Sequence, residues 1–72
     1  MNQKEENFKR IAENRTNKII ELISKLHNLS NTSFYQYSDE QIDAIFDAIQ
    51  TELDNQRKEF KKNIKGKRFE LW

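Results

Sequence analysis

Apolar residues recur at alternating steps of three and four positions in two parts of the chain, residues 8–26 and 42–60. This spacing places side chains on one narrow stripe of an α-helix. The two series run in opposite directions about a break near residues 29–38, so the pattern predicts an all-α protein that folds as an antiparallel helical hairpin, with helices over about 4–28 and 39–63. Positions whose numbers sum to 68 pair into six layers: Leu26 with Ile42, Leu22 with Phe46, Ile19 with Ile49, Arg15 with Leu53, Ala12 with Gln56, and Phe8 with Phe60.

The residues at the predicted helix ends agree with this division. Residues 28–33, Asn-Leu-Ser-Asn-Thr-Ser, favour a turn because their short polar side chains bond their own backbone. Ser38, followed three positions later by Gln41, has the sequence of a capping box and predicts the start of the second helix. Gly66 is the first residue suited to end that helix. We expect residues 1–72 to form a single small helical domain, with 64–72 as a flexible basic and aromatic tail.

Polar residues interrupt the predicted seam at the end away from the turn. Arg15 and Gln56 occupy neighbouring layers, and Glu52 lies beside Leu53, within reach of Arg15 in the hairpin. A buried arginine is costly unless it is paired. One interpretation is that this polar seam sets the register and the partner orientation, as polar seam residues do in coiled coils. The other is that the polar end is left open for a ligand or another protein.

Some apolar residues cannot be covered by two helices alone. Ile11, Ile20, Ile23 and Ile45 flank the seam or lie off it. The simplest way to cover them is dimerisation, which completes a four-helix bundle, and a different protein partner would use the same residues. The connection between the helices contains three aromatic residues, Phe34, Tyr35 and Tyr37. This aromatic connection can serve as a lid over the apolar end of the hairpin or as a binding platform. The predicted protein interface is therefore Ile20, Ile23, Ile45, Phe34, Tyr35 and Tyr37.

The composition favours a second chain as a source of stability. A chain of 72 residues has a marginal core unless a disulfide, a metal or a partner supports it, and this one has no cysteine. Apolar residues and charged residues each make up 35%, with a net charge of +1, so neither a disordered polyelectrolyte nor a generally basic nucleic-acid coat is indicated. No apolar run approaches a signal peptide or a membrane span. We expect a cytoplasmic protein that does not bind membranes.

Charge is segregated along the second helix. Residues 39–54 carry a net charge of −6 and residues 57–68 a net charge of +6. The basic half would attract the phosphates of nucleic acid. The acidic stripe, formed by Asp39, Asp43 and Asp47, would mimic a row of phosphates. Solvated helix faces commonly carry such charges without either function. The candidate nucleic-acid contacts are Arg57, Lys58, Lys61, Lys62, Lys65, Lys67 and Arg68, and the candidate phosphate mimics are Asp39, Asp43 and Asp47.

Residues that would support catalysis are missing from the pattern. His27 is the only histidine and sits at a predicted helix end, where a contact with the helix dipole is its expected role. Zinc sites need cysteines or several histidines, and phosphate loops need several glycines, whereas Gly66 stands alone. We therefore expect no enzyme activity, no cofactor, no metal and no small-molecule substrate.

Four short segments carry a resemblance: 15–19 (Arg-Thr-Asn-Lys-Ile), 28–31 (Asn-Leu-Ser-Asn), 37–40 (Tyr-Ser-Asp-Glu) and 45–49 (Ile-Phe-Asp-Ala-Ile). With them the chain resembles small, mostly uncharacterised helical proteins carried by plasmids, integrative elements and phages of low-GC Gram-positive bacteria. The likeness covers roughly residues 8–61, and it implies a mobile-element setting without transferring any functional residue. We expect a non-enzymatic helical protein–protein interaction module that modulates a partner protein. The alternatives are an RNA- or DNA-binding regulator that uses the basic half of the second helix, and an anti-CRISPR-like inhibitor of a host defence nuclease that uses the acidic stripe.

Overall fold

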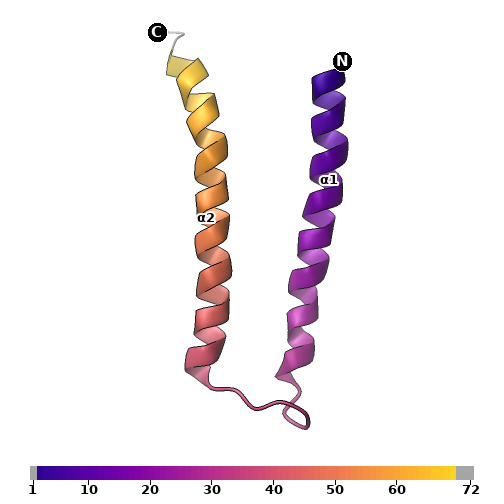
Figure 1. Ribbon diagram of the computed structural model, residues 1–72, viewed down its shortest axis with the longest axis vertical. Helices are drawn as coiled ribbons and strands as arrows, with labels where there is room; N and C mark the ends of the chain where they lie inside the picture. The colour runs from indigo at the N-terminus through magenta and orange to yellow at the C-terminus, as the bar shows by residue number, and fades with distance from the viewer. Residues whose placement is uncertain (1, 70–72) are drawn as a thin grey trace. The chain divides into compact units, whose positions relative to one another are not determined.

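The protein is built from two long helices joined by a short 3₁₀ segment and an irregular connection (Figure 1). The structure, a computed structural model, describes the backbone of residues 2–69 and the side chains of residues 2–63. Its elements are α1 (Gln3–Ser24), η1 (Lys25–Ser30) and α2 (Asp39–Phe69), with no strand among the described residues. The all-α prediction is therefore confirmed for this part of the chain. The chain divides into two units, Met1–Gln36 and Tyr37–Trp72, and the hairpin packing stays a prediction.

Helix α1 begins two residues after the chain start because Asn2 caps it. The Asn2 side-chain oxygen Oδ1 accepts a hydrogen bond from the backbone N–H of Glu5 at 2.8 Å. This bond satisfies one of the amide groups that the first turn of a helix leaves without a partner. Glu5 and Glu6 place carboxylates at the positive end of the helix dipole. The observed start at Gln3 lies one residue before the predicted one.

The end of α1 differs from the prediction in its type of helix. The α-helix stops at Ser24, and the chain continues as the tighter η1 where the sequence predicted an α-helix to residue 28. Two serine hydroxyls bond carbonyl oxygens three residues back: Ser24 Oγ donates to Glu21 at 2.7 Å, and Ser30 Oγ donates to His27 at 2.6 Å. Hydroxyl groups that bond backbone carbonyls in this way compete with the regular hydrogen bonds of the α-helix. Turns of 3₁₀ type are common where α-helices end.

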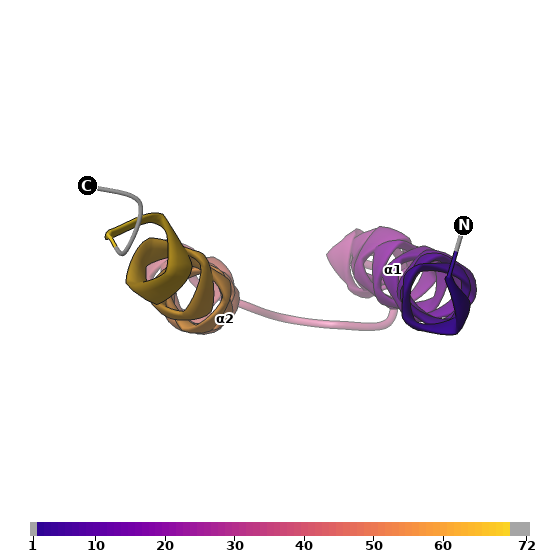
Figure 2. The ribbon, with the colours of Figure 1, turned by 90° about the horizontal axis from the view of Figure 1, so that it is seen from above.

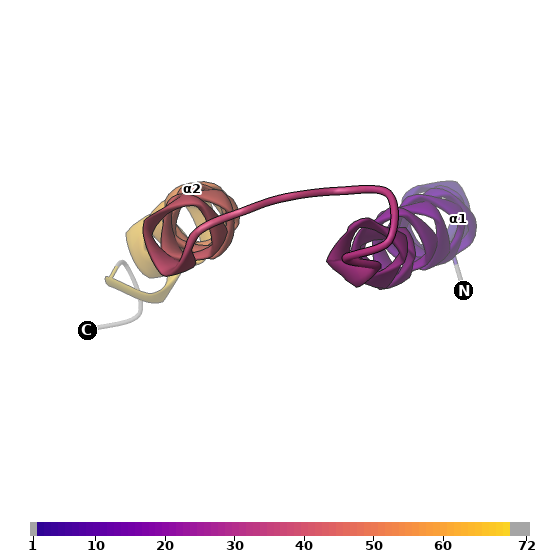
Figure 3. The ribbon, with the colours of Figure 1, turned by 90° about the horizontal axis from the view of Figure 1, so that it is seen from below.

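The connection after η1 is drawn as an irregular trace in Figure 3. Asn31 organises its backbone. Its side-chain oxygen accepts the backbone N–H of Ser33 at 2.9 Å, and its carbonyl oxygen accepts the N–H groups of Phe34 and Tyr35 at 3.1 and 3.0 Å. An asparagine that bonds the backbone two residues on is typical of a turn. The predicted break in the polar segment 28–33 is therefore confirmed, and Asn31 gives it a defined backbone.

Helix α2 begins with the predicted capping box. The backbone N–H of Ser38 donates to Gln41 Oε1 at 2.9 Å, and the backbone N–H of Gln41 donates to Ser38 Oγ at 3.2 Å. Each residue thus satisfies an amide group of the other. The predicted helix end at residue 63 is wrong, because the backbone stays helical to Phe69 and passes through Gly66. A single glycine costs only about 1 kcal/mol relative to alanine inside a helix, and no proline follows to stop it.

Removing the Ser38 hydroxyl should destabilise the start of α2. Ser38→Ala leaves the N–H of Gln41 without its side-chain acceptor, and loss of such a cap costs about 1 kcal/mol. Urea unfolding followed by circular dichroism measures this cost. Ser33→Ala, a serine in the same connection but outside the box, is the matched control and should be nearly neutral. Equal unfolding midpoints for the two variants would contradict the role assigned to the box.

Candidate protein-interaction surface

Both helices present their apolar stripes to the surroundings. None of the side chains of residues 2–63 is buried. In α1, Leu22 is 65% exposed and Ile19 is 50% exposed, and in α2, Phe46 and Leu53 are 50% and 47% exposed. Amphipathic helices draw most of their stability from burying such a stripe, so a covering surface must come from packing beyond each single helix.

The stripe of α1 has a centre and two flanks. Successive residues of a helix lie about 100° apart around its axis, which Figure 2 shows close to end-on. On this geometry, Phe8, Ala12 and Ile19 lie near one line, with Leu22 and Ile23 on either side, whereas Leu26 lies beyond α1 in η1. Ile11 and Ile20 lie on opposite flanks, roughly 180° apart. Of the predicted interface residues in α1, Ile23 therefore adjoins the stripe, and Ile20 lies well away from its centre.

The stripe of α2 is arranged in the same way. Ile42, Ile49 and Phe60 lie near its centre line. Phe46 and Leu53 lie toward one side of that line, and Ile45 toward the other. Ile45 is only just exposed, whereas Ile42 and Ile49 are partly covered by side chains of their own unit. Ile45, the third predicted helical interface residue, thus adjoins the stripe as Ile23 does in α1.

Arg15 and Gln56 lie on these stripes, in separate units, and Glu52 lies on a flank of the α2 stripe. Arg15 is exposed beside the Ile19 line of α1. In α2, Gln56 Nε2 donates to Glu52 Oε2 at 2.8 Å, so the carboxylate of Glu52 already has a partner four residues away. Such pairs four positions apart face each other on a helix. The pairing of Arg15 with Glu52 stays a prediction, and the bond from Gln56 would hold the carboxylate in place for it.

The aromatic connection is strongly exposed. Phe34 is 78% exposed, and Tyr35 and Tyr37 are also exposed. The bonds that Phe34 and Tyr35 make to Asn31 fix the backbone beneath their rings. Large aromatic area on a defined turn favours binding, since rings at surfaces are common anchors of protein contacts. The choice between a lid and a binding platform stays open.

The two charge clusters share one flank of α2. Asp43 and Asp47 lie on it toward the helix start, and Arg57 and Lys61 continue it toward the helix end. Asp39 begins the same flank, while Lys58 and Lys62 lie farther around the helix. All of these residues are exposed, and no group of residues suited to hold a metal ion occurs in the described part of the chain. The candidate contacts Lys65, Lys67 and Arg68 lie outside the described side chains.

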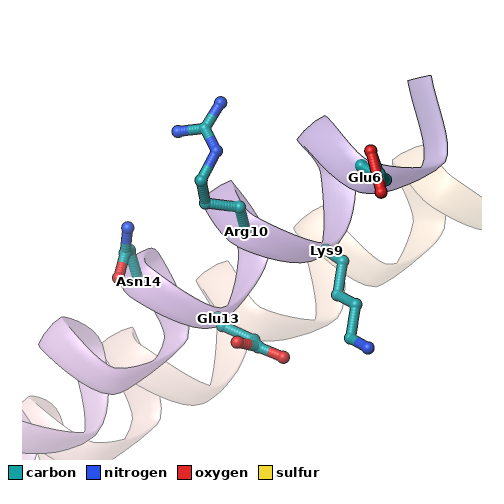
Figure 4. A pocket seen from close by; sticks show the side chains of 5 residues that line it. All are labelled: Glu6, Lys9, Arg10, Glu13 and Asn14. Carbon is teal, nitrogen blue, oxygen red and sulfur yellow. The ribbon is translucent and has the colours of Figure 1, made fainter. Parts of the chain in front are cut away.

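An open depression on α1 carries mixed charges (Figure 4). It is lined by Glu6, Lys9, Arg10, Glu13 and Asn14. Arg10 and Asn14 point to one side of the helix, and Lys9 and Glu13 point to the other, so the side chains do not converge on a common point. A ligand site needs convergent polar groups within a concave, largely enclosed surface. This depression is better described as the solvated face of α1.

His27 has the contact that its position predicts. Its ring nitrogen Nδ1 lies in hydrogen-bond contact with the carbonyl oxygen of Ser24, at the end of α1. Carbonyl groups at a helix end lack intrahelical partners and attract donors. Nearby, Glu21 and Lys25 form an ion pair at 3.4 Å, the only one among the described side chains. These contacts give His27, Glu21 and Lys25 partners at this end of the helix.

Comparisons with family models, with curated proteins and with solved structures find no match to this chain. Within the described residues, neither α1 nor α2 contains a stretch long and apolar enough to cross a membrane. The features of the molecule that bear on function are the exposed apolar stripes, the aromatic connection and the two charge clusters.

Proposed function

We propose that this protein is a non-enzymatic helical interaction module. Helices α1 and α2 pack as an antiparallel hairpin through the layers whose residue numbers sum to 68, and a protein partner covers the apolar residues that remain outside. The observation that carries the proposal is that most of the large apolar side chains of both helices are exposed and that none of the side chains of residues 2–63 is buried. Apolar surface on this scale on a small protein marks an interaction site.

The hairpin accounts for the stripes but not for their flanks. Covering the exposed half of a leucine or phenylalanine side chain is worth about 1 kcal/mol, so pairing the stripes supports the fold. Ile20 lies about 100° from Ile19 around the axis of α1, and a helix packed on the stripe does not reach that far. Ile20 is also 58% exposed. A partner at this flank completes the coverage, as the third and fourth helices do in a four-helix bundle.

A non-enzymatic interaction module acts by altering the activity or assembly of the protein that it binds. The resemblance of segments in residues 8–61 to proteins of mobile elements supports a partner from the host cell or from the element itself. This setting is part of the proposal.

Nucleic-acid binding is the second candidate. Arg57, Lys58, Lys61 and Lys62 lie within two turns of α2, are exposed, and form no ion pair with a described side chain. Closely spaced cations of this kind attract phosphates in a salt-dependent, sequence-independent way. The third candidate, inhibition of a nuclease through Asp39, Asp43 and Asp47, is supported by their exposure along one flank of α2.

Affinity capture with and without nuclease treatment tests the module. The tagged protein is used as bait in lysate of a low-GC Gram-positive host, to which a differently tagged copy of the chain has been added. The proposal expects retention of a protein, either the second copy or a host protein, that survives nuclease treatment. A Lys58→Gln/Lys62→Gln variant should retain it equally well. Retention that is lost after nuclease treatment and in this variant would overturn the module in favour of nucleic-acid binding.

A further inference from the structure

Three large apolar residues of α2 form a symmetric row. Phe46, Leu53 and Phe60 follow one another at intervals of seven residues, which places them on nearly the same line two turns apart. They are 50%, 47% and 59% exposed. The row reads the same in both directions from Leu53, because a phenylalanine stands seven positions away on each side. A two-fold axis through Leu53 would therefore bring Phe46 of one copy onto Phe60 of an antiparallel copy.

The charges beside this row have the matching arrangement. Phe46 and Leu53 lie on the side of the stripe nearest to Asp43, Asp47, Arg57 and Lys61, and Phe60 lies near its centre line. Residues 39–54 carry −6 and residues 57–68 carry +6, so two parallel copies of α2 would place like charges together. Antiparallel copies place each acidic half beside a basic half. The helix dipoles favour the same orientation.

The positions of the charged residues agree with the position of the apolar row. Contacts between Phe46 and Phe60 of an antiparallel copy join residues whose numbers sum to 106. Asp43 with Lys61, and Asp47 with Arg57, each sum to 104. The difference of two residues is an offset of about 3 Å along the helix axis, which the long lysine and arginine side chains span. One two-fold axis thus satisfies both the apolar row and the charged flank.

We propose that the partner is a second copy of this chain, docked antiparallel along α2 with its two-fold axis at Leu53. Phe46 contacts Phe60 of the second copy, Leu53 contacts its own equivalent, and Asp43 and Asp47 lie beside Lys61 and Arg57 of the second copy. The inference rests on the proposed function: it names the partner and places one contact face on α2. Phe46, Leu53 and Phe60 lie between α1 of their own chain and α2 of the second copy, because each helix in a four-helix bundle has a neighbour on each side.

Charge reversal on one flank tests the docking. Sedimentation equilibrium at low ionic strength compares the parent with Asp43→Lys/Asp47→Lys and with Arg57→Glu/Lys61→Glu. Each double variant turns attraction into repulsion at both ends of the dimer, so its dissociation constant should rise by at least about tenfold. The fourfold variant that combines all these substitutions restores complementarity with the original net charge, and its dimer should recover. Circular dichroism of every variant verifies that the helices remain.

The orientation is tested by disulfide trapping, which is clean because the chain has no cysteine. When Asp43→Cys protein is mixed with Lys61→Cys protein, the antiparallel dimer should yield the disulfide between residues 43 and 61 of different copies. Disulfides that join 43 to 43 and 61 to 61 would overturn the antiparallel arrangement. A parent protein that is monomeric throughout the micromolar range would overturn the second copy as partner. If that monomer still captures a host protein, the proposed function stands and only this inference fails.

Discussion

Replacing Leu22 with aspartate should abolish the cooperative unfolding transition of the protein. Leu22 is 65% exposed on α1, and in the proposed hairpin it packs against Phe46. The substitution removes an apolar side chain from that layer and places an unpaired charge there, at a cost of about 3 kcal/mol or more. The core of so small a chain supplies no more than about 3–5 kcal/mol, so most molecules should unfold. Thermal unfolding followed by circular dichroism measures the loss.

Asn17→Asp is the matched control for this prediction. It adds the same charge to the same helix, but Asn17 lies on the face of α1 opposite to the stripe. Its unfolding midpoint should stay close to that of the parent. If Leu22→Asp and Asn17→Asp melt alike, the stripe of α1 is not covered in the folded protein, and the hairpin is wrong.

Replacing Ile20 with aspartate should separate the module from its partner while leaving the hairpin folded. Ile20 lies on the flank of α1 that the hairpin does not reach, and a charge there would be buried against the partner. We expect binding to weaken by about 2 kcal/mol, roughly thirtyfold. Retention in the capture experiment should therefore be lost, while the thermal midpoint of the isolated hairpin stays within a few degrees.

The control for Ile20 is Asn14→Asp, on the polar face of α1 beside the open depression. This variant should retain the partner as the parent does. Full retention by Ile20→Asp would mean that the partner contacts another surface, and the exposed aromatic side chains of Phe34, Tyr35 and Tyr37 would then be the next candidates.

The local structure followed from the sequence wherever neighbouring residues decide it. The box of Ser38 and Gln41 was predicted from two side chains and formed as expected. Asn2 was overlooked as a cap, although Glu5 three positions later gave the same kind of signal. Residue preferences do not predict the change from α1 to η1 after Ser24, because 3₁₀ and α-helices share those preferences. The two differ here because the hydroxyls of Ser24 and Ser30 bond backbone carbonyls. The predicted end of the second helix before Gly66 was wrong, because one glycine weakens a helix without ending it.

The candidate surface was harder to predict than the helices. Periodicity identifies which side chains share a stripe, so the positions of Leu22 on α1 and of Phe46 and Leu53 on α2 follow from it. It does not say what covers them, because packing between distant segments and between chains depends on complementarity that spacing alone does not encode. Only along α2 do the charges indicate how a neighbouring helix is oriented, because the acidic and basic halves of α2 favour an antiparallel neighbour.

Nuclear Overhauser contacts test most directly whether α1 and α2 pack through the layers whose residue numbers sum to 68. The side-chain methyl groups of Leu22 should show contacts to the ring of Phe46, and those of Ile19 to the methyl groups of Ile49, within one chain in a mixture of labelled and unlabelled protein. Contacts in another register, or no contacts between α1 and α2 within one chain, would contradict the account.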